Sequence, residues 1–108
     1  MSYDIWLAVD TGGSELTNIN CLSWNYTSNC GRMWRTAGAD LAEFHGKPAG
    51  ECFPILVAAI QELKANPDKY RAMNPENGWG SYGGLLPALQ ELAVAFEHHP
   101  KAIVQVWR

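Results

Sequence analysis

The sequence is short of charged residues, and of basic ones above all. Its 108 residues include 8 Lys and Arg against 11 Asp and Glu, which gives a formal net charge of −3. Because non-specific nucleic-acid binding depends on a basic surface, this balance argues against a general nucleic-acid partner. The hydrophobic fraction of 47% is ordinary for a folded domain, so the low charge does not indicate disorder.

Long apolar runs and a cysteine framework are also missing. No stretch approaches the roughly 20 residues that cross a bilayer. The first residues lack the basic start and the apolar run of a secretory signal. The three cysteines, Cys21, Cys30 and Cys52, are an odd number at spacings that fit no disulfide framework. We therefore expect a reduced, cytoplasmic protein without a membrane partner.

Motifs for catalysis and metal binding are absent as well. His45, His98 and His99 form no familiar metal spacing, and no G-x-S-x-G elbow occurs. The carboxylates are numerous, but spacing alone places no two of them together. We expect no metal, no cofactor and no catalytic residue, so an enzyme is the less favoured class. A small hydrolase with Glu76 or Asp40 as its base remains a third hypothesis.

Hydrophobic periodicity predicts an α+β domain that spans residues 1–108. Period-two alternation and β-branched residues predict strands over 3–9, 16–26 and 101–107. Helical spacing and capping residues predict helices over 31–37, from about 48 or 51 to 65, and from about 81 to 97. Shorter helical turns are expected over 40–45 and 68–73. The order predicts a small antiparallel sheet of about three strands, with neighbouring terminal strands and helices packed on one face.

The second predicted strand is unusually rich in asparagine. Asn18, Asn20 and Asn25 all fall within it, although asparagine is depleted in strands and costly to bury. We therefore expect one of its faces to line a wet cavity or to lie at an edge. The outer face of the sheet is expected to carry Trp6, these asparagines and Trp107. A three-stranded sheet leaves edges exposed, which favours a homo-oligomer that pairs or covers them.

Aromatic and hydrogen-bonding side chains gather between Trp24 and Asn29, and Trp34-Arg35 follows. Aromatic rings stack on ligand rings, amides and hydroxyls bind polar edges, and arginine forks onto phosphate. A structural explanation stands beside this one. Residues 27–29 are typical helix caps, and the aromatic rings suit a small hydrophobic core.

The run 73–84 is dense in glycine and leads into the clearest predicted helix. Residues 78–83 fit G-x-G-x-x-G, but a turn precedes them where the dinucleotide motif needs a strand. Unpaired N–H groups and the positive end of the helix dipole favour an anion at such a site. The simpler interpretation is a rigid connector whose glycines allow Trp79 and Tyr82 to pack.

Several of these segments together resemble a group of small phage and prophage proteins of the actinobacteriophage type. The shared segments are the NYTSN run at 25–29, the MWR run at 33–35 and the YRAMNPENGWG run at 70–80. The resemblance covers nearly the whole chain. It implies a phage context, in which small acidic proteins inhibit a host protein or sequester a nucleotide signal of host immunity. It implies no catalytic residue, and it implies the host cytoplasm as the location if a phage encodes the protein.

Together these patterns predict a non-enzymatic binding protein for a small polar ligand, with nucleotide-derived immune signals as the leading class. Its pocket is expected between the 24–29 segment and the 78–84 loop. The residues predicted to bind are Trp24, Asn25, Tyr26, Thr27, Asn29, Arg35, Asn77, Trp79, Ser81, Gly83 and Gly84. The alternative is an inhibitor that binds a host protein through an exposed Trp/Arg patch.

Overall fold

Three antiparallel strands form one sheet in the order β2-β1-β3, in agreement with the predicted fold class. The strands are β1 (Ser2–Val9), β2 (Thr17–Thr27) and β3 (Ile103–Trp107). The computed structural model describes residues 2–76, 78 and 80–108, and in β2 the side chains of 20–22 lie outside that description. Both terminal strands pair as neighbours, as expected, because β1 is central and contacts β3 directly.

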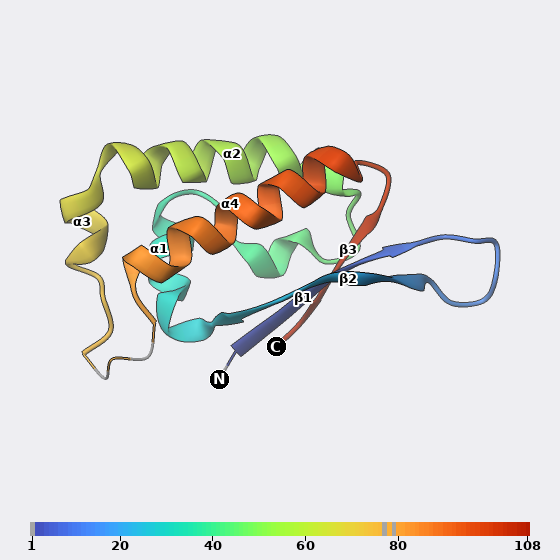
Figure 1. Ribbon diagram of the computed structural model, residues 1–108, viewed down its shortest axis with the longest axis horizontal. Coiled ribbons are helices and arrows are strands. Elements are labelled where there is room, and N and C mark those ends of the chain that lie inside the picture. The colour runs from blue at the N-terminus through green and yellow to red at the C-terminus, as the bar shows by residue number, and fades with distance from the viewer. Residues whose placement is uncertain (1, 77, 79) are drawn as a thin grey trace.

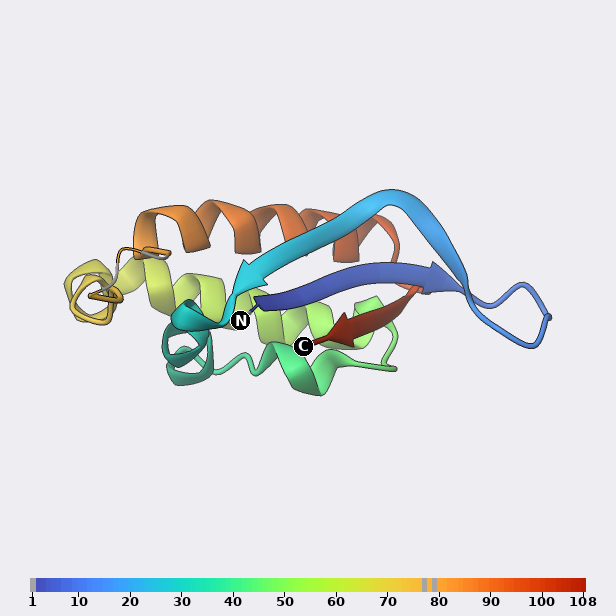
Figure 2. The ribbon, with the colours of Figure 1, turned by 90° about the horizontal axis from the view of Figure 1, so that it is seen from below.

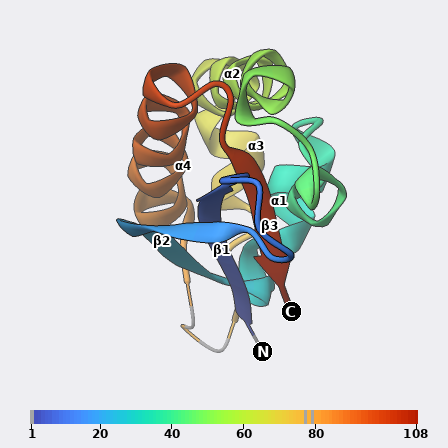
Figure 3. The same cartoon turned by 90° about the vertical axis from the view of Figure 1, so that its right-hand side faces the viewer.

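All the helices lie on one face of this sheet (Figures 1 and 3). They are the 3-10 helices η1 (Ser28–Cys30) and η2 (Leu41–Phe44), and the α-helices α1 (Gly31–Thr36), α2 (Ala49–Ala65), α3 (Pro67–Arg71) and α4 (Tyr82–His98). The long helices α2 and α4 run side by side in opposite directions (Figure 1). Helices on one side of an antiparallel sheet make the α+β layer arrangement that the element order predicted.

The alternation of β1 decides which face of the sheet is covered. Tyr3, Ile5 and Leu7 are buried and point toward the helices, whereas Asp4 is exposed and Trp6 is half-buried on the opposite face. Successive side chains of a strand point to opposite faces, so Asp4 and Trp6 face away from the helices, and Ala8 in the same row is buried. The outer face of the sheet therefore carries Trp6, in agreement with the sequence prediction.

Helical spacing places the apolar side chains of α2 and α4 toward the same core. The fully buried leucines include Leu56 and Leu63 of α2 and Leu89 and Leu92 of α4. Burial of each leucine side chain contributes about 1.5–3 kcal/mol relative to exposure, so this helix pair accounts for much of the core. Pro54 lies inside α2, which begins at Ala49. In the described part of the chain, no helix is long and apolar enough to cross a membrane.

A large bulge interrupts the pairing of β2 with β1. Trp6 pairs with Ser23 and Ala8 pairs with Asn18, so the four residues 19–22 of β2 lie opposite Leu7 alone. Figure 2 shows β2 arching away from β1 between the two paired parts. Extra residues in one strand must leave the ladder, and the strand bends away as a result. This local opening of the sheet creates the largest hollow described below.

The free side of β3 is closed by the chain that leads into α2. The Gly46 N–H donates to Val104 O at 2.8 Å, and the Val104 N–H donates to Lys47 O at 2.9 Å. Two residues further along β3, the Val106 N–H donates to His45 Nδ1 at 3.0 Å. These bonds satisfy backbone groups that an edge strand otherwise presents to other chains. One edge of the sheet is therefore protected.

Candidate functional site

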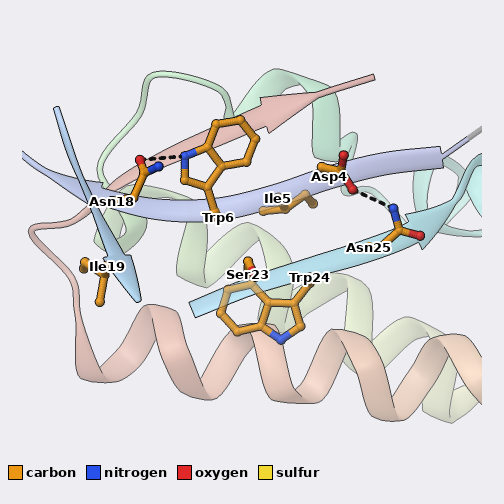
Figure 4. A pocket seen from close by; sticks show the side chains of 8 residues that line it. All are labelled: Asp4, Ile5, Trp6, Asn18, Ile19, Ser23, Trp24 and Asn25. Carbon is orange, nitrogen blue, oxygen red and sulfur yellow. Dashed lines mark hydrogen bonds between the residues drawn. The ribbon is translucent and has the colours of Figure 1, made fainter. Parts of the chain in front are cut away.

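The bulge in β2 opens a hollow of about 560 Å³ between the first two strands. We call it the sheet hollow. Its described lining consists of Asp4, Ile5, Trp6, Asn18, Ile19, Ser23, Trp24 and Asn25 (Figure 4). The volume falls within the range of about 300–1,000 Å³ typical of small-molecule sites. Two of the residues predicted to bind ligand, Trp24 and Asn25, belong to this lining.

Hydrogen bonds fix the polar side chains of the sheet hollow in place. The Trp6 indole donates to Asn18 Oδ1 at 3.0 Å. The Asn25 amide donates to Asp4 Oδ1 at 2.6 Å and to Ser2 Oγ at 3.1 Å. In the described part of the chain, these bonds leave the Asn18 amide as a donor and the Asn25 carbonyl oxygen as an acceptor. The hollow thus offers held polar groups of both kinds to a ligand.

The sheet hollow carries negative charge, which does not suit a phosphate group. Asp4 is the only ionisable side chain in its described lining, and that lining includes no Lys, Arg or His. A carboxylate repels an anion and attracts a cation or a hydrogen-bond donor. The part of a ligand that enters this hollow should therefore be neutral or positively charged.

The two indoles of the sheet hollow leave their strands in different directions. Figure 4 shows Trp6 rising from β1 beside Asn18, whereas Trp24 extends from β2 toward α4. Trp24 is half-buried and packs against the hydrophobic core. A flat ligand would stack on one of these rings rather than enter a sandwich between both. The half-buried Trp6, which Asn18 holds in orientation, is the better placed of the two.

The segments predicted to form the pocket meet at a second, smaller cavity of about 180 Å³. We call it the loop cleft, and its lining consists of Asn25, Tyr26, Thr27, Cys30, Gly80, Ser81, Gly84, Leu85 and Ala88. Gly80 has φ +98°, and a Cβ at this position would lie 2.5 Å from Thr27 Cγ2 and 2.8 Å from Cys30 Sγ. A glycine is therefore required where the loop crosses the end of β2.

Buried groups form the inner wall of the loop cleft. Tyr26 is only 4% exposed, its hydroxyl donates to Ala88 O at 2.8 Å, and burial raises its pKa. Its ring packs edge-on against Trp34, so the ring face is not open for stacking. Burial also raises the pKa of the Cys30 thiol, despite a hydrogen bond from the Ser81 backbone. This thiol is therefore poorly suited to nucleophilic chemistry.

The first turn of α4 uses its own N–H groups within the chain. The Ser81 hydroxyl accepts from the Gly84 N–H at 3.1 Å, and Asn74 Oδ1 accepts from the Tyr82 N–H at 2.8 Å. An anion at a helix N-terminus needs such N–H groups to be available. The geometry of this turn therefore favours a capped, structural helix start.

Three further predicted binding residues, Asn29, Arg35 and Gly83, lie outside both cavities. Arg35 is exposed on α1, where its guanidinium covers Gly31, and Asn29 is exposed, with its N–H bonded to Thr27 Oγ1. Gly83 is exposed at the start of α4 and lines neither cavity. Asn77 and Trp79 lie outside the described residues. The structure thus divides the other described residues of the predicted set between two neighbouring cavities that share Asn25.

Sequence reasoning did not include Asp4, Trp6, Asn18 or Ser23 among the binding residues. The asparagine-rich second strand carried a signal for a wet cavity, but the partners of its residues depend on the bulge. In the described part of the chain, no group of three His, Cys, Asp or Glu side chains could hold a metal ion. No family model, curated protein or solved structure matches the chain.

Proposed function

We propose that this chain is a non-enzymatic binding protein for a small polar ring compound, which it holds in the sheet hollow. The observation that carries the proposal is the hollow itself, about 560 Å³ in volume and lined by two indoles and four polar side chains. Indole faces contribute stacking and apolar contact. Fixed amide and carboxylate groups contribute orientation and selectivity.

The lining favours a neutral ring with both donors and acceptors on its edge. The Asn18 amide donates, whereas the Asn25 carbonyl oxygen and the Asp4 carboxylate accept. Nucleobases, nucleosides and monosaccharides have edges of this kind. For a nucleotide-derived ligand, the base or the sugar would occupy the hollow, and the phosphate would remain in solvent away from Asp4. Sequestration of such a compound is the role that suits a small phage protein.

Binding is best tested with purified protein and a panel of nucleosides, monosaccharides and their phosphates, by thermal shift and calorimetry. A ligand at about 100 times its Kd stabilises the folded state by about 2.7 kcal/mol, which is easily measured in a domain of this size. We expect the nucleoside or sugar to bind at least as tightly as its phosphate. Binding that requires the phosphate would contradict the assignment to this hollow.

Matched variants locate the site. Trp6→Ala removes the indole that Asn18 holds in orientation at the hollow, whereas Trp107→Ala removes an indole that is 70% exposed and does not line the hollow. We expect Trp6→Ala to weaken binding at least tenfold and Trp107→Ala to leave it unchanged. Unchanged stoichiometry and a cooperative melt establish that the Trp6 variant is folded. Equal binding by both variants would exclude the sheet hollow.

A second candidate function rests on the exposure of Trp107. This side chain is 70% exposed at the end of β3, beside Asp4 on the outer face of the sheet. Exposed tryptophans are frequent hot spots of protein interfaces, which supports inhibition of a host protein as the alternative. In that case Trp107→Ala would abolish a stable complex with the host protein, and Trp6→Ala would have less effect.

A further inference from the structure

The direction of the backbone groups along β3 fixes their direction along the whole sheet. Val104 donates to Lys47 O and accepts from the Gly46 N–H, so its backbone groups point away from β1. In an antiparallel ladder, hydrogen-bonded and non-hydrogen-bonded pairs alternate. Leu7, which lies opposite Val104, therefore points its own backbone groups toward β2. By the same alternation, Ile5 and Tyr3 also bond to β2.

The same alternation identifies the backbone groups on the outer edge of β2. Trp24 pairs with Ile5 and Tyr26 pairs with Tyr3, so these residues of β2 bond inward. Ser23, Asn25 and Thr27 alternate with them, so their backbone N–H groups point outward. Figure 3 shows β2 at the border of the sheet with no strand beyond it. In the described part of the chain, no segment hydrogen-bonds along this edge of β2 as the 46–47 segment does along β3. The loop at Gly80 contacts the Thr27 side chain and lies across the loop cleft from the Thr27 end of the edge.

The composition of β2 leaves this edge without the usual protection. Residues 16–31 contain no Asp, Glu, Lys, Arg or Pro. Natural edge strands commonly carry charges or proline, which discourage pairing with another chain. The bulge at 19–22 limits the regular part of the edge to 23–27. A short, regular and uncharged edge of this kind can pair in one register.

We propose that two copies of this chain join through β2, whose 23–27 edges pair antiparallel around a two-fold axis at Asn25. Asn25 then lies opposite itself, and Ser23 lies opposite Thr27 of the partner subunit. Each copy carries a net charge of −3, but the paired strands are uncharged, so like charges do not meet there. Because the β3 edge is closed, pairing stops at a dimer with a continuous six-stranded sheet.

This arrangement goes beyond the proposed ligand binding and does not depend on it. Ser23 and Asn25 line the sheet hollow, so pairing places the two hollows on either side of the two-fold axis. The dimer is tested without any ligand. Failure of one proposal is therefore distinguishable from failure of the other.

The test compares Asn25→Pro with Asn25→Ala by sedimentation equilibrium and light scattering. Both variants lose the side-chain bond to Asp4, but only proline also removes the outward N–H at the centre of the interface. We expect twice the chain mass of 12.0 kDa for the parent and for Asn25→Ala, and a monomer for Asn25→Pro. A monomeric parent at every accessible concentration would overturn the proposal, and so would a dimeric Asn25→Pro.

Amide hydrogen exchange of the unmodified protein gives a second readout that needs no variant. In the dimer, the outward N–H groups of Ser23, Asn25 and Thr27 should be protected like the inward N–H groups of the same strand. Dilution to the monomer should remove the protection of these three outward groups only. Fast exchange at Asn25 in a dimeric sample would place the interface elsewhere, for example on the outer side of α2 and α4, and would overturn strand pairing.

Discussion

Gly80→Ala tests whether the glycine-rich loop is fixed against the end of β2. The new Cβ would lie 2.5 Å from Thr27 Cγ2 and 2.8 Å from Cys30 Sγ, closer than non-bonded atoms approach. Thr27 cannot easily turn aside, because it is β-branched and its hydroxyl accepts from the Asn29 N–H. Cys30 is 2% exposed and packs in the hydrophobic core. Steric relief must therefore come from displacement of the loop or of β2.

The loss of folding stability expected for Gly80→Ala has two parts, and Gly78→Ala is the control variant that separates them. Gly80 has φ +98° and Gly78 has φ +75°, so alanine at either position carries about 1–2 kcal/mol of backbone strain. Among the described residues, no atom lies within 4 Å of a Cβ at Gly78. Overpacking adds about 1–3 kcal/mol at Gly80 alone. We therefore expect Gly80→Ala to cost about 1–3 kcal/mol more than Gly78→Ala.

The free energy of unfolding of both variants is measured by urea titration, with unfolding followed by circular dichroism. A difference of about 1 kcal/mol corresponds to about 4–8 °C in Tm for a domain near this size. Thr27→Ser removes the clashing methyl group and keeps the capping hydroxyl, so it should recover part of the loss in a double-mutant cycle. Equal destabilisation by Gly78→Ala and Gly80→Ala, without coupling to Thr27→Ser, would refute the close contact.

Three further outcomes follow from single contacts. Burial and the hydrogen-bonded carboxylate of Glu62 raise the pKa of Tyr70 from 10.0 to about 12. The stability that the neutral Tyr70 side chain contributes is complete below about pH 10 and is lost as the pH rises through about 12. The Tm of Tyr70→Phe should therefore fall less than that of the parent as the pH is raised. Ser81→Ala removes the N-cap of α4 and should cost about 1 kcal/mol in urea unfolding, whereas Ser81→Asp should not. His45→Ala frees the Val106 N–H, and we expect faster amide exchange at that position with little change in fold.

The strands and helices could be predicted because their signals are local. Tyr3, Ile5 and Leu7 recur at every second position of β1, and the leucines of α4 repeat at helical spacing, so the buried face of each element can be predicted from its sequence. The neighbouring positions of the two terminal strands could be predicted from the order of the elements along the chain. These features depend on the period of the side chains, which the sequence carries directly.

The arrangement of the site could be predicted only in part, because it depends on a change of register. Strict alternation in β2 would place Asn18 and Trp24 on the same side, but residues 19–22 lie outside the regular ladder. Asn18 consequently bonds the Trp6 indole, and Trp24 turns toward α4. Arg35 was assigned to the ligand from its proximity in sequence, whereas α1 carries it to a separate surface.

The bulge in β2 also bears on how this protein can change during evolution. The ladders on its two sides are anchored independently, at Asn18 opposite Ala8 and at Ser23 opposite Trp6. Insertions, deletions or substitutions within 19–22 can therefore alter the hollow without moving any inward-facing side chain of β1. Of these four positions, Ile19 is in the described lining of the hollow and also packs against the core. A lineage under pressure to bind a new compound could therefore vary the length of this stretch while it keeps the two flanking ladders and an apolar residue at position 19.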